Sequence, residues 1–595
     1  MRGRDIRSVV SAGLAFLSLA GFPAAVSASL LREVADADRA ADGAVAAIST
    51  VAELSAHQAR WRAAWLRGLG GLPERTPLRA QEGVVTVCNG FTLQNVLFES
   101  LPGVYVVGHL ALPTAPQFRP PYPAVAMPMG HSDRGILAPP YADHLAMMAR
   151  AGFAAFTWDP LSQGERRQGD PRFDATWGQC AAEHTRLGAR GWLVGWNFAR
   201  FRIWDGIRAI DYLASRKDVD LSRLGVCGTS GGGTMSAYLQ ALDSRVKVAF
   251  PNCFVSSIRE VFACRGCHDA EQFYWGQLTD GLNHAAILAL GQPRVQLAVG
   301  SRWEDYFPQR GTAATVAILS DLQSRLGVPS RVWQFHCAGP HGLAAPTRAA
   351  QVDWMRFCGR GGEPPRALSE YWRLSTGDHR ASDSVNGWPL PFPPEATFFT
   401  PMRQVRDRAG FKSLYSLMSD RARALAATRK RLSRERLREV VRRRANIRPL
   451  AQLRAEGRCP HVSFDHPNFD WWYLSGAFGM RRENEAGMLA TLGRSVVGRD
   501  AENIILRSLA EGGGRPVCLR AKGWNCIAAA HALAAEPELF SGIDFQEPPP
   551  SWTQLVTDPD PAHDSFAIGV WGALEEYDWT DLVRGFVRSD SRDDN

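Results

Sequence analysis

Long apolar runs are scarce in this sequence, and their scarcity excludes whole classes of protein. The one extended run, residues 9–22, is shorter than the ~20 residues that a membrane-spanning helix needs, and no other segment could span a bilayer. Ligand patterns for zinc are also lacking, because Cys264 and Cys267 form a single CxxC pair and His268 beside them does not complete a site. We therefore expect no multispanning membrane protein, no metal ion and no organic cofactor.

The first 28 residues have the pattern of a secretory signal peptide. Arg2, Arg4 and Arg7 precede the apolar run, and small residues around Ala28 offer a cleavage site. We expect export to the periplasm or the medium after cleavage, with an uncleaved N-terminal anchor as the alternative. In an exported protein, eleven cysteines permit disulfides and leave at least one thiol unpaired. Cys264 and Cys267 could bridge to each other or to Cys253.

Length and composition indicate a folded protein of more than one domain. The chain has 595 residues, of which 45% are apolar and 22% charged. After the signal peptide (1–28), glycine- and proline-rich stretches divide it into a domain over 29–358, a linker with a basic helix over 359–455, and a C-terminal region over 456–595.

Much of the net charge of +8 is concentrated in residues 421–448, for which we expect a basic helix with Ser419 as its N-cap. The simplest interpretation is a solvated helix between domains, and the alternative is attraction to an anionic polymer. We expect no nucleic-acid partner.

Residues 228–233, Gly-Thr-Ser-Gly-Gly-Gly, contain the Gly-x-Ser-x-Gly pattern of a nucleophile elbow. The apolar residues 224–227 before it predict a short buried strand, and residues 233–242 after it predict a helix. Glycines flank Ser230 because such a sharp turn leaves no room for Cβ atoms. This setting predicts Ser230 as a nucleophile, which needs a base and an orienting acid.

Both partners follow in the chain order that this kind of elbow requires. Asp305 comes just after the predicted strand 295–300, and Glu304 beside it is the alternative acid. His341 lies in a loop after the predicted strand 330–335, and His336 is the alternative base. The carboxyl ends of parallel strands are where catalytic groups collect, so we expect Asp305 and His341 near Ser230.

The oxyanion of such a reaction needs backbone donors. One is the N–H of Gly231, and the other is a main-chain N–H near His131, in the loop that Gly130 opens after strand 122–129. The His131 side chain either lines the pocket or has no role. Asp159 and Arg166 follow strand 154–158, and we interpret them as a pair that holds their loop.

Matches to one family run in order through residues 121–357. Besides Ser230 and its glycines they lie at 130–132, 158–166, 183–188, 204–213, 269–272, 305–308 and 341–342. This set resembles the acetylxylan esterase-like branch of the α/β-hydrolases, close to the dienelactone hydrolase type. The resemblance implies a doubly wound, mostly parallel α/β sheet and a triad of Ser230, Asp305 and His341. It also implies short acyl esters, often acetylated sugars, as substrates, and Glu271 becomes a candidate pocket residue.

The C-terminal region has a faint internal repeat of the elbow. A predicted strand over 515–522 leads to Gly523, a helix follows over 527–535, and another precedes over 501–509. We expect a degenerate, hydrolase-like α/β region, or else an unrelated appendage. It has no serine at the elbow, and Cys526 would be a nucleophile only with a paired histidine.

The sequence therefore predicts an exported serine hydrolase of carboxylic, chiefly acetyl, esters on a small molecule or an acetylated polysaccharide. One alternative is a serine exopeptidase of the prolyl-oligopeptidase kind. About 100 residues separate the cleavage site from Gly130, which is too few for a propeller of four-stranded blades. The other alternative is a polysaccharide-binding protein without catalysis.

Overall fold

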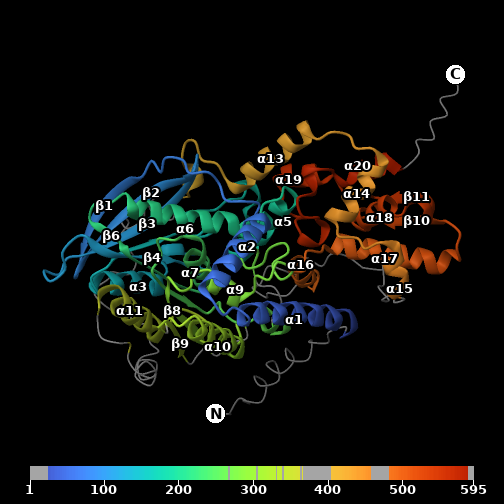
Figure 1. Ribbon diagram of the computed structural model, residues 1–595. Helices are drawn as coiled ribbons and strands as arrows, with labels where there is room; N and C mark the ends of the chain where they lie inside the picture. The colour runs from blue at the N-terminus through green and yellow to red at the C-terminus, as the bar shows by residue number, and fades with distance from the viewer. Residues whose placement is uncertain are drawn as a thin grey trace, which may run out of the picture.

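The computed structural model describes residues 24–264, 269–302, 306–329, 331–337, 341–361, 365, 404–456 and 481–586. Within these residues the largest sheet has nine strands in the order β1-β2-β3-β5-β4-β6-β7-β8-β9 (Figure 1). The pairings of β1 with β2, β2 with β3 and β3 with β5 are antiparallel, and those of β5 with β4 and of every later pair in this order are parallel. Their bounds are β1 Gln81–Cys88, β2 Phe91–Leu101, β3 Val104–Pro113, β4 Tyr122–Pro128, β5 Ala154–Trp158, β6 Val219–Thr229, β7 Val248–Asn252, β8 Gln296–Arg302 and β9 Val332–Cys337.

Helices cover both faces of this sheet, since its central strands are apolar on both sides. One face packs on α3 (Pro139–Arg150) and α11 (Ala345–Arg360). The other packs on α6 (Phe198–Ala214), α7 (Gly231–Leu242) and α10 (Gln309–Arg325), with α2 (Val51–Leu69) and α9 (His284–Ala289) beyond them. The predicted doubly wound, mostly parallel α/β fold is confirmed.

The N-terminal helix α1 (Ala24–Ala46) lies against α8 (Ile258–Cys264), α9 and α10. It begins before the predicted cleavage site at Ala28, while residues 1–23 of the predicted signal peptide lie outside the described residues. Within the described residues, no helix combines the length and apolar character that crossing a bilayer requires. The predicted pairing of Cys264 also cannot be followed, because Cys267 lies outside the described residues.

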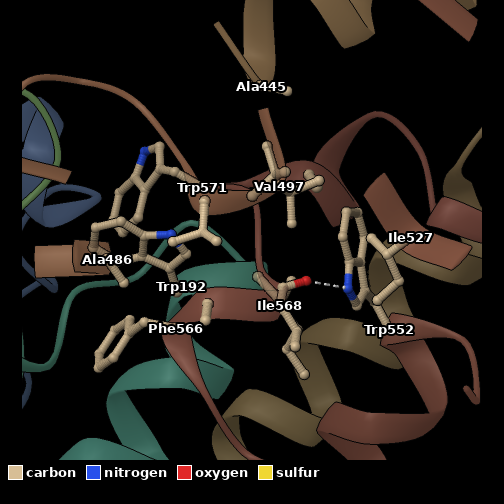
Figure 2. Packing of buried hydrophobic residues seen from close by; sticks show 14 of the residues in the cluster. Trp192, Ala445, Ala486, Val497, Ile527, Trp552, Phe566, Ile568 and Trp571 are labelled. Carbon is tan, nitrogen blue, oxygen red and sulfur yellow. Dashed lines mark hydrogen bonds between the residues drawn. The ribbon is translucent and has the colours of Figure 1, made fainter. Parts of the chain in front are cut away.

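The C-terminal residues form a second hydrophobic core together with α5 (Ala181–Leu193), a helix that precedes β6 in the chain. The core joins Trp192 of α5 to residues such as Met418, Val497 and Trp571. Figure 2 shows part of it, where the indole N–H of Trp552 donates to the carbonyl of Ile568 at 3.0 Å. The helices concerned are α13 Leu414–Thr428, α14 Arg434–Arg444, α15 Leu450–Glu456, α16 Arg481–Thr491, α17 Val496–Gly512, α18 Asn525–Ala535, α19 Trp552–Thr557 and α20 Trp579–Phe586.

Two parallel strands of this region, β10 (Val517–Lys522) and β11 (Phe540–Gln546), flank α18. Between β10 and α18 the chain turns at Gly523 with a φ of +58°, so the predicted strand, turn and helix are present. Cys526 is buried, and burial raises the pKa of its thiol to about 11. His531 contacts the Ile527 carbonyl and the Tyr577 hydroxyl, at 2.7 and 3.0 Å, so its ring nitrogens are engaged away from this thiol.

The basic segment forms two helices, α13 and α14, so the expectation of one helix capped by Ser419 is wrong. Ser413 caps α13 and Ser433 caps α14. Ser419 lies buried within α13, where its hydroxyl donates to the Val556 carbonyl at 3.0 Å.

The arginines of α14 contact carboxylates of the C-terminal region. Arg438 and Arg442 reach Glu536, while Arg444 reaches both Glu575 and Glu576. Much of the basic charge therefore lies in ion pairs within the protein.

Candidate active site

Ser230 lies on a strained turn between β6 and α7. Its φ of +60° and ψ of −125° are rare for a residue with a side chain. A Cβ at Gly232 would lie 2.2 Å from the Pro128 carbonyl oxygen, and one at Gly233 would lie 2.2 Å from that of Asn252. The N–H of Ser230 donates to the Asn252 carbonyl at 3.0 Å. The glycines are therefore required because α7 begins in direct contact with the ends of β4 and β7.

The loop after β4 lies beside this serine, as expected for an oxyanion loop. A Cβ at Gly130 would lie 3.1 Å from the Ser230 Cβ and 2.8 Å from the Tyr141 hydroxyl. The Gly130 N–H donates to that hydroxyl, and burial raises the pKa of Tyr141 to about 12. The N–H of Ser132 donates to Gln163 at 2.6 Å. Within 130–132, the N–H of His131 is therefore the candidate donor for a substrate.

His341 follows β9, the neighbour of β8. Its ring lies 5.1 Å from that of Tyr306 and 6.1 Å from that of Phe307. Asp305, and Glu304 beside it, lie outside the described residues. Because Tyr306 is next to Asp305 in sequence, the segments expected to carry acid and base are in contact.

The alternative base, His336, lies within β9 itself. Its Nδ1 is 3.2 Å from the Ser301 hydroxyl on β8. This contact engages His336 along the sheet, whereas His341 lies in the loop beyond the strand end, where a base can approach a substrate.

Asp159 and Arg166 hold the loop after β5, although not by pairing their charged groups. The Asp159 carboxylate accepts the N–H groups of Ile136 and Glu165 at 2.7 and 2.8 Å. Arg166 donates to the Asp159 backbone carbonyl and to the Asp205 carboxylate, both at 2.8 Å. Burial raises the pKa of Asp159 to about 6. Both residues are buried and serve the loop.

Four ionisable side chains form a cluster next to Ser230: His131, His184, Asp269 and Glu271. Asp269 lies 3.0 Å from His131 Nε2 and 3.0 Å from His184 Nδ1. Glu271 lies 3.2 Å from Arg202 Nε. Burial raises the pKa of Asp269, but the two imidazoles outweigh burial and hold this pKa well below its usual range. Burial lowers the pKa of His131, but Asp269 outweighs it, and the net change is upward.

This cluster borders the predicted oxyanion donor. A Cβ at Gly231 would lie 2.6 Å from Glu271 Oε1 and 3.2 Å from His131 Cε1. His131 is the member that reaches solvent, with a side chain 20% exposed, against 1% or less for His184 and Asp269.

The sequence indicated His131 and Glu271 singly, and it marked the other two only as parts of matching motifs. Their assembly was missed because it depends on tertiary structure. The signal present was that His184 and Asp269 both fall within the motifs of the resemblance.

No protein-family model matches the sequence. The chain is 28% identical over 205 residues to "Putative hydrolase YtaP" of Bacillus subtilis (strain 168). The match covers 31% of this chain and spans 61% of that protein's length.

Similar solved structures include "Methylesterase BT1017", with 19% identity, a TM-score of 0.41, and coverage of 54% of this chain and 68% of that one. A glucuronoyl esterase from Solibacter usitatus has 17% identity, a TM-score of 0.39, and coverage of 50% and 91%. An acetyl xylan esterase from Paenibacillus sp. R4 has 20% identity, a TM-score of 0.32, and coverage of 51% and 93%. The solved structures named here are carboxylic ester hydrolases, and the Bacillus relative is named a hydrolase.

Proposed function

We propose that this protein is an exported serine hydrolase that cleaves carboxylic esters, chiefly acetyl esters on a carbohydrate, through an acyl-enzyme. The observation that carries the proposal is the strained Ser230, at the end of β6 and the start of α7. A residue with a side chain is held at such a φ only where the surrounding structure imposes it. An elbow is the turn that exposes a nucleophilic hydroxyl above the sheet.

In the proposed reaction, the Ser230 hydroxyl attacks the ester carbonyl while His341 takes its proton and Asp305 orients the imidazole. The tetrahedral intermediate collapses, the alcohol leaves with that proton, and Ser230 is acylated. Water then attacks the acyl group through the same base, which releases the acid and restores the serine. The N–H groups of Gly231 and His131 bind the oxyanion, and the positive end of the α7 dipole favours its charge.

The substrate class rests on the resemblance of the sequence motifs to acetylxylan esterase-like hydrolases, and export rests on the N-terminal pattern. The elbow itself is common to hydrolases of several substrate classes. An acetylated polysaccharide outside the cytoplasm is the substrate that satisfies both lines of argument.

The first test compares hydrolysis of 4-nitrophenyl acetate and acetylated xylan by the wild type, Ser230→Ala and Ser236→Ala. Ser236 is a matched control, because its hydroxyl lies in the same helix and donates to the Gly232 carbonyl at 2.8 Å. We expect Ser230→Ala to lose at least ~10³-fold in kcat and Ser236→Ala to keep activity. Equal activity of Ser230→Ala and wild type would refute the mechanism. Cleavage of the small ester alone would leave the mechanism standing and refute the polysaccharide.

A second comparison separates the alternative bases and acids. We expect His341→Ala and Asp305→Asn to lose activity as Ser230→Ala does, while His336→Ala and Glu304→Gln lose little. The reverse order within either pair would reassign that role. Covalent labelling of Ser230 by a fluorophosphonate gives a readout that does not depend on the substrate, and failure of labelling would favour a binding protein.

The exopeptidase alternative receives no support from the N-terminal part of the fold. Residues 24–121, all described, form two helices and three strands that join the central sheet, which is not a propeller arrangement. Peptide chromogens should therefore be poor substrates, and efficient turnover of them would reverse this conclusion.

A further inference from the structure

The cluster of His131, His184, Asp269 and Glu271 has a hydrogen-bonding conflict that points to a cation. His184 Nε2 lies 3.0 Å from the Leu161 carbonyl oxygen, which can only accept a hydrogen bond, so Nε2 carries the proton. In the neutral ring, Nδ1 then presents a lone pair. That lone pair faces the Asp269 carboxylate at 3.0 and 3.1 Å and His131 Nε2 at 3.4 Å. Acceptors converge on this point, and a positive charge between them resolves the conflict.

The second observation is the Glu271 carboxylate. It is fully buried, and neither of its oxygens accepts a hydrogen bond from the described residues, although Arg202 Nε lies 3.2 Å away. Arg202 supplies one positive charge against the two buried carboxylates of Asp269 and Glu271, so one negative charge is left for a further cation to compensate. The Glu271 carboxylate also lies close to the converging acceptors, since one ligand atom from each of the four residues can be chosen so that all lie within 4.8 Å of one another.

The spacing suits a transition-metal ion. Ligand atoms of a tetrahedral zinc site with bonds of about 2.0–2.1 Å lie roughly 3.3 Å apart. His131 Nε2, His184 Nδ1 and the nearest Asp269 oxygen are separated by 3.0–3.4 Å. Two imidazoles with two carboxylates make a set that suits Zn²⁺ better than Mg²⁺ or Ca²⁺, which prefer oxygen ligands alone.

The surroundings also have the features of an outer ligand shell. A metal-binding histidine commonly donates its other N–H to a backbone carbonyl, as His184 does to Leu161. A ligating carboxylate is itself hydrogen-bonded, as Asp269 is by the Glu271 N–H at 3.0 Å.

We propose that His131, His184, Asp269 and Glu271 bind a zinc-type divalent cation beside the nucleophile elbow. This proposal replaces our expectation from the sequence that no metal binds. It goes beyond the proposed esterase function and does not depend on it, because metal binding is measured directly. A cation bound there would place positive charge next to Gly231, where a substrate oxyanion is expected, and His131, with a side chain 20% exposed, is the ligand nearest to solvent.

The test uses the full chain, stripped with a chelator and dialysed. Zinc is then titrated in competition with a chromophoric chelator, and bound metal is counted by mass spectrometry. We expect one zinc per chain in the wild type, with no comparable uptake of Mg²⁺ or Ca²⁺. Loss of an outer-shell partner typically weakens binding ~10–100-fold, so loss of a ligand in Asp269→Asn or Glu271→Gln should weaken it at least ~100-fold.

Two control variants distinguish the loss of a metal ligand from unfolding and from the loss of esterase activity. His131→Gln changes the most exposed member, and zinc should raise the Tm of the wild type but not of this variant, with circular dichroism confirming that both are folded. Ser230→Ala should bind zinc like the wild type even though it is inactive.

Co²⁺ substitution adds a spectroscopic readout, since a tetrahedral site gives visible absorption that His184→Ala should abolish. Absence of zinc from folded wild type would overturn the proposal and leave a buried imidazolium in the cation's place. Unchanged zinc binding by Asp269→Asn and His131→Gln would also overturn it, by assigning the metal to another site.

Discussion

Arg190 of α5 holds the C-terminal region against the hydrolase-like fold, and replacing it with methionine tests how strongly. Its Nε lies 2.6 Å from the Asp564 carboxylate. Its Nη1 and Nη2 donate to the backbone carbonyls of Val556, Asp558 and Asp560 at 3.3, 2.5 and 3.0 Å. The side chains of Arg190 and Asp564 are only 1% and 4% exposed. Arg190→Met therefore leaves a buried carboxylate without its counter-ion.

Removing one partner of a buried ion pair costs about 3–5 kcal/mol, whereas an exposed pair is worth ~0–1 kcal/mol. The Arg190 guanidinium also lies over the rings of Trp177 and Tyr415, at 4.8 and 5.1 Å from their centroids. We expect Arg190→Met to lower the free energy of unfolding by about 3–5 kcal/mol at pH 8. Arg423, exposed and paired with Asp420 at 3.1 Å, supplies the control, because Arg423→Met should change stability by less than about 1 kcal/mol.

Lowering the pH should reduce the loss of unfolding free energy caused by Arg190→Met. Burial already raises the pKa of Asp564 to about 6 while Arg190 lowers it, so loss of Arg190 raises it further. Below that pKa the carboxyl is neutral and its burial costs less, so Arg190→Met should lose less stability at pH 5 than at pH 8.

The assay is urea unfolding followed by tryptophan fluorescence at both pH values, with Asp564→Asn and the double variant completing a thermodynamic cycle. We expect one transition in which the two changes are coupled by at least ~1 kcal/mol. A loss below ~1 kcal/mol in Arg190→Met at pH 8, or strict additivity in the cycle, would refute the reasoning.

Three further predictions concern other parts of the molecule. Burial raises the pKa of Asp159 to about 6, above its unfolded value of 3.8, so ionisation of Asp159 lowers the stability of the fold by up to about 3 kcal/mol as pH rises from ~4 to ~6. The urea midpoint of Asp159→Asn should therefore depend less on pH than that of the wild type, and a steeper dependence would contradict this. Gly232→Ala places a Cβ 2.2 Å from the Pro128 carbonyl oxygen and should lower the unfolding free energy by about 1–3 kcal/mol or more. The control Gly43→Ala, whose Cβ would have nothing within 4 Å, should keep or raise the Tm. Calorimetry measures both variants, and equal Tm values would contradict the prediction. Arginines within residues 438–444 pair with carboxylates of the same chain, so the protein should elute from a heparin column at or below physiological salt concentration. Elution only at higher salt would restore the anionic-polymer interpretation.

The sequence predicted the parts of the fold that depend on local patterns. Apolar strands alternating with amphipathic helices specify a doubly wound sheet, and Ser230 with its glycines specifies the elbow, because a Cβ at Gly232 or Gly233 would overlap a backbone carbonyl. The division of the basic segment was not predictable in this way. No glycine or proline lies between Thr428 and Arg434, and the chain leaves the helix where Arg429 donates to the Leu574 carbonyl at 3.2 Å.

The four-residue cluster shows a second limit of prediction from local patterns. Its members span residues 131 to 271, and they come from the loop after β4, from α5 and from the segment before α9. No regular spacing connects them, since their approach is produced by tertiary packing, in which α5 contacts α6. Ligand patterns are recognisable in sequence only when the ligands share an element or a tight loop.

Helix α5 contacts α6 of the sheet region and also α13 and α19 of the C-terminal region (Figure 1). It carries His184 in the cluster beside Ser230 and Arg190 in the contact with the C-terminal region, six residues and about 9 Å further along the helix axis. A displacement of the C-terminal region that moved α5 would therefore also move His184. Because the C-terminal region contacts α5 through Arg190, we expect it to support the position of His184 in the four-residue cluster.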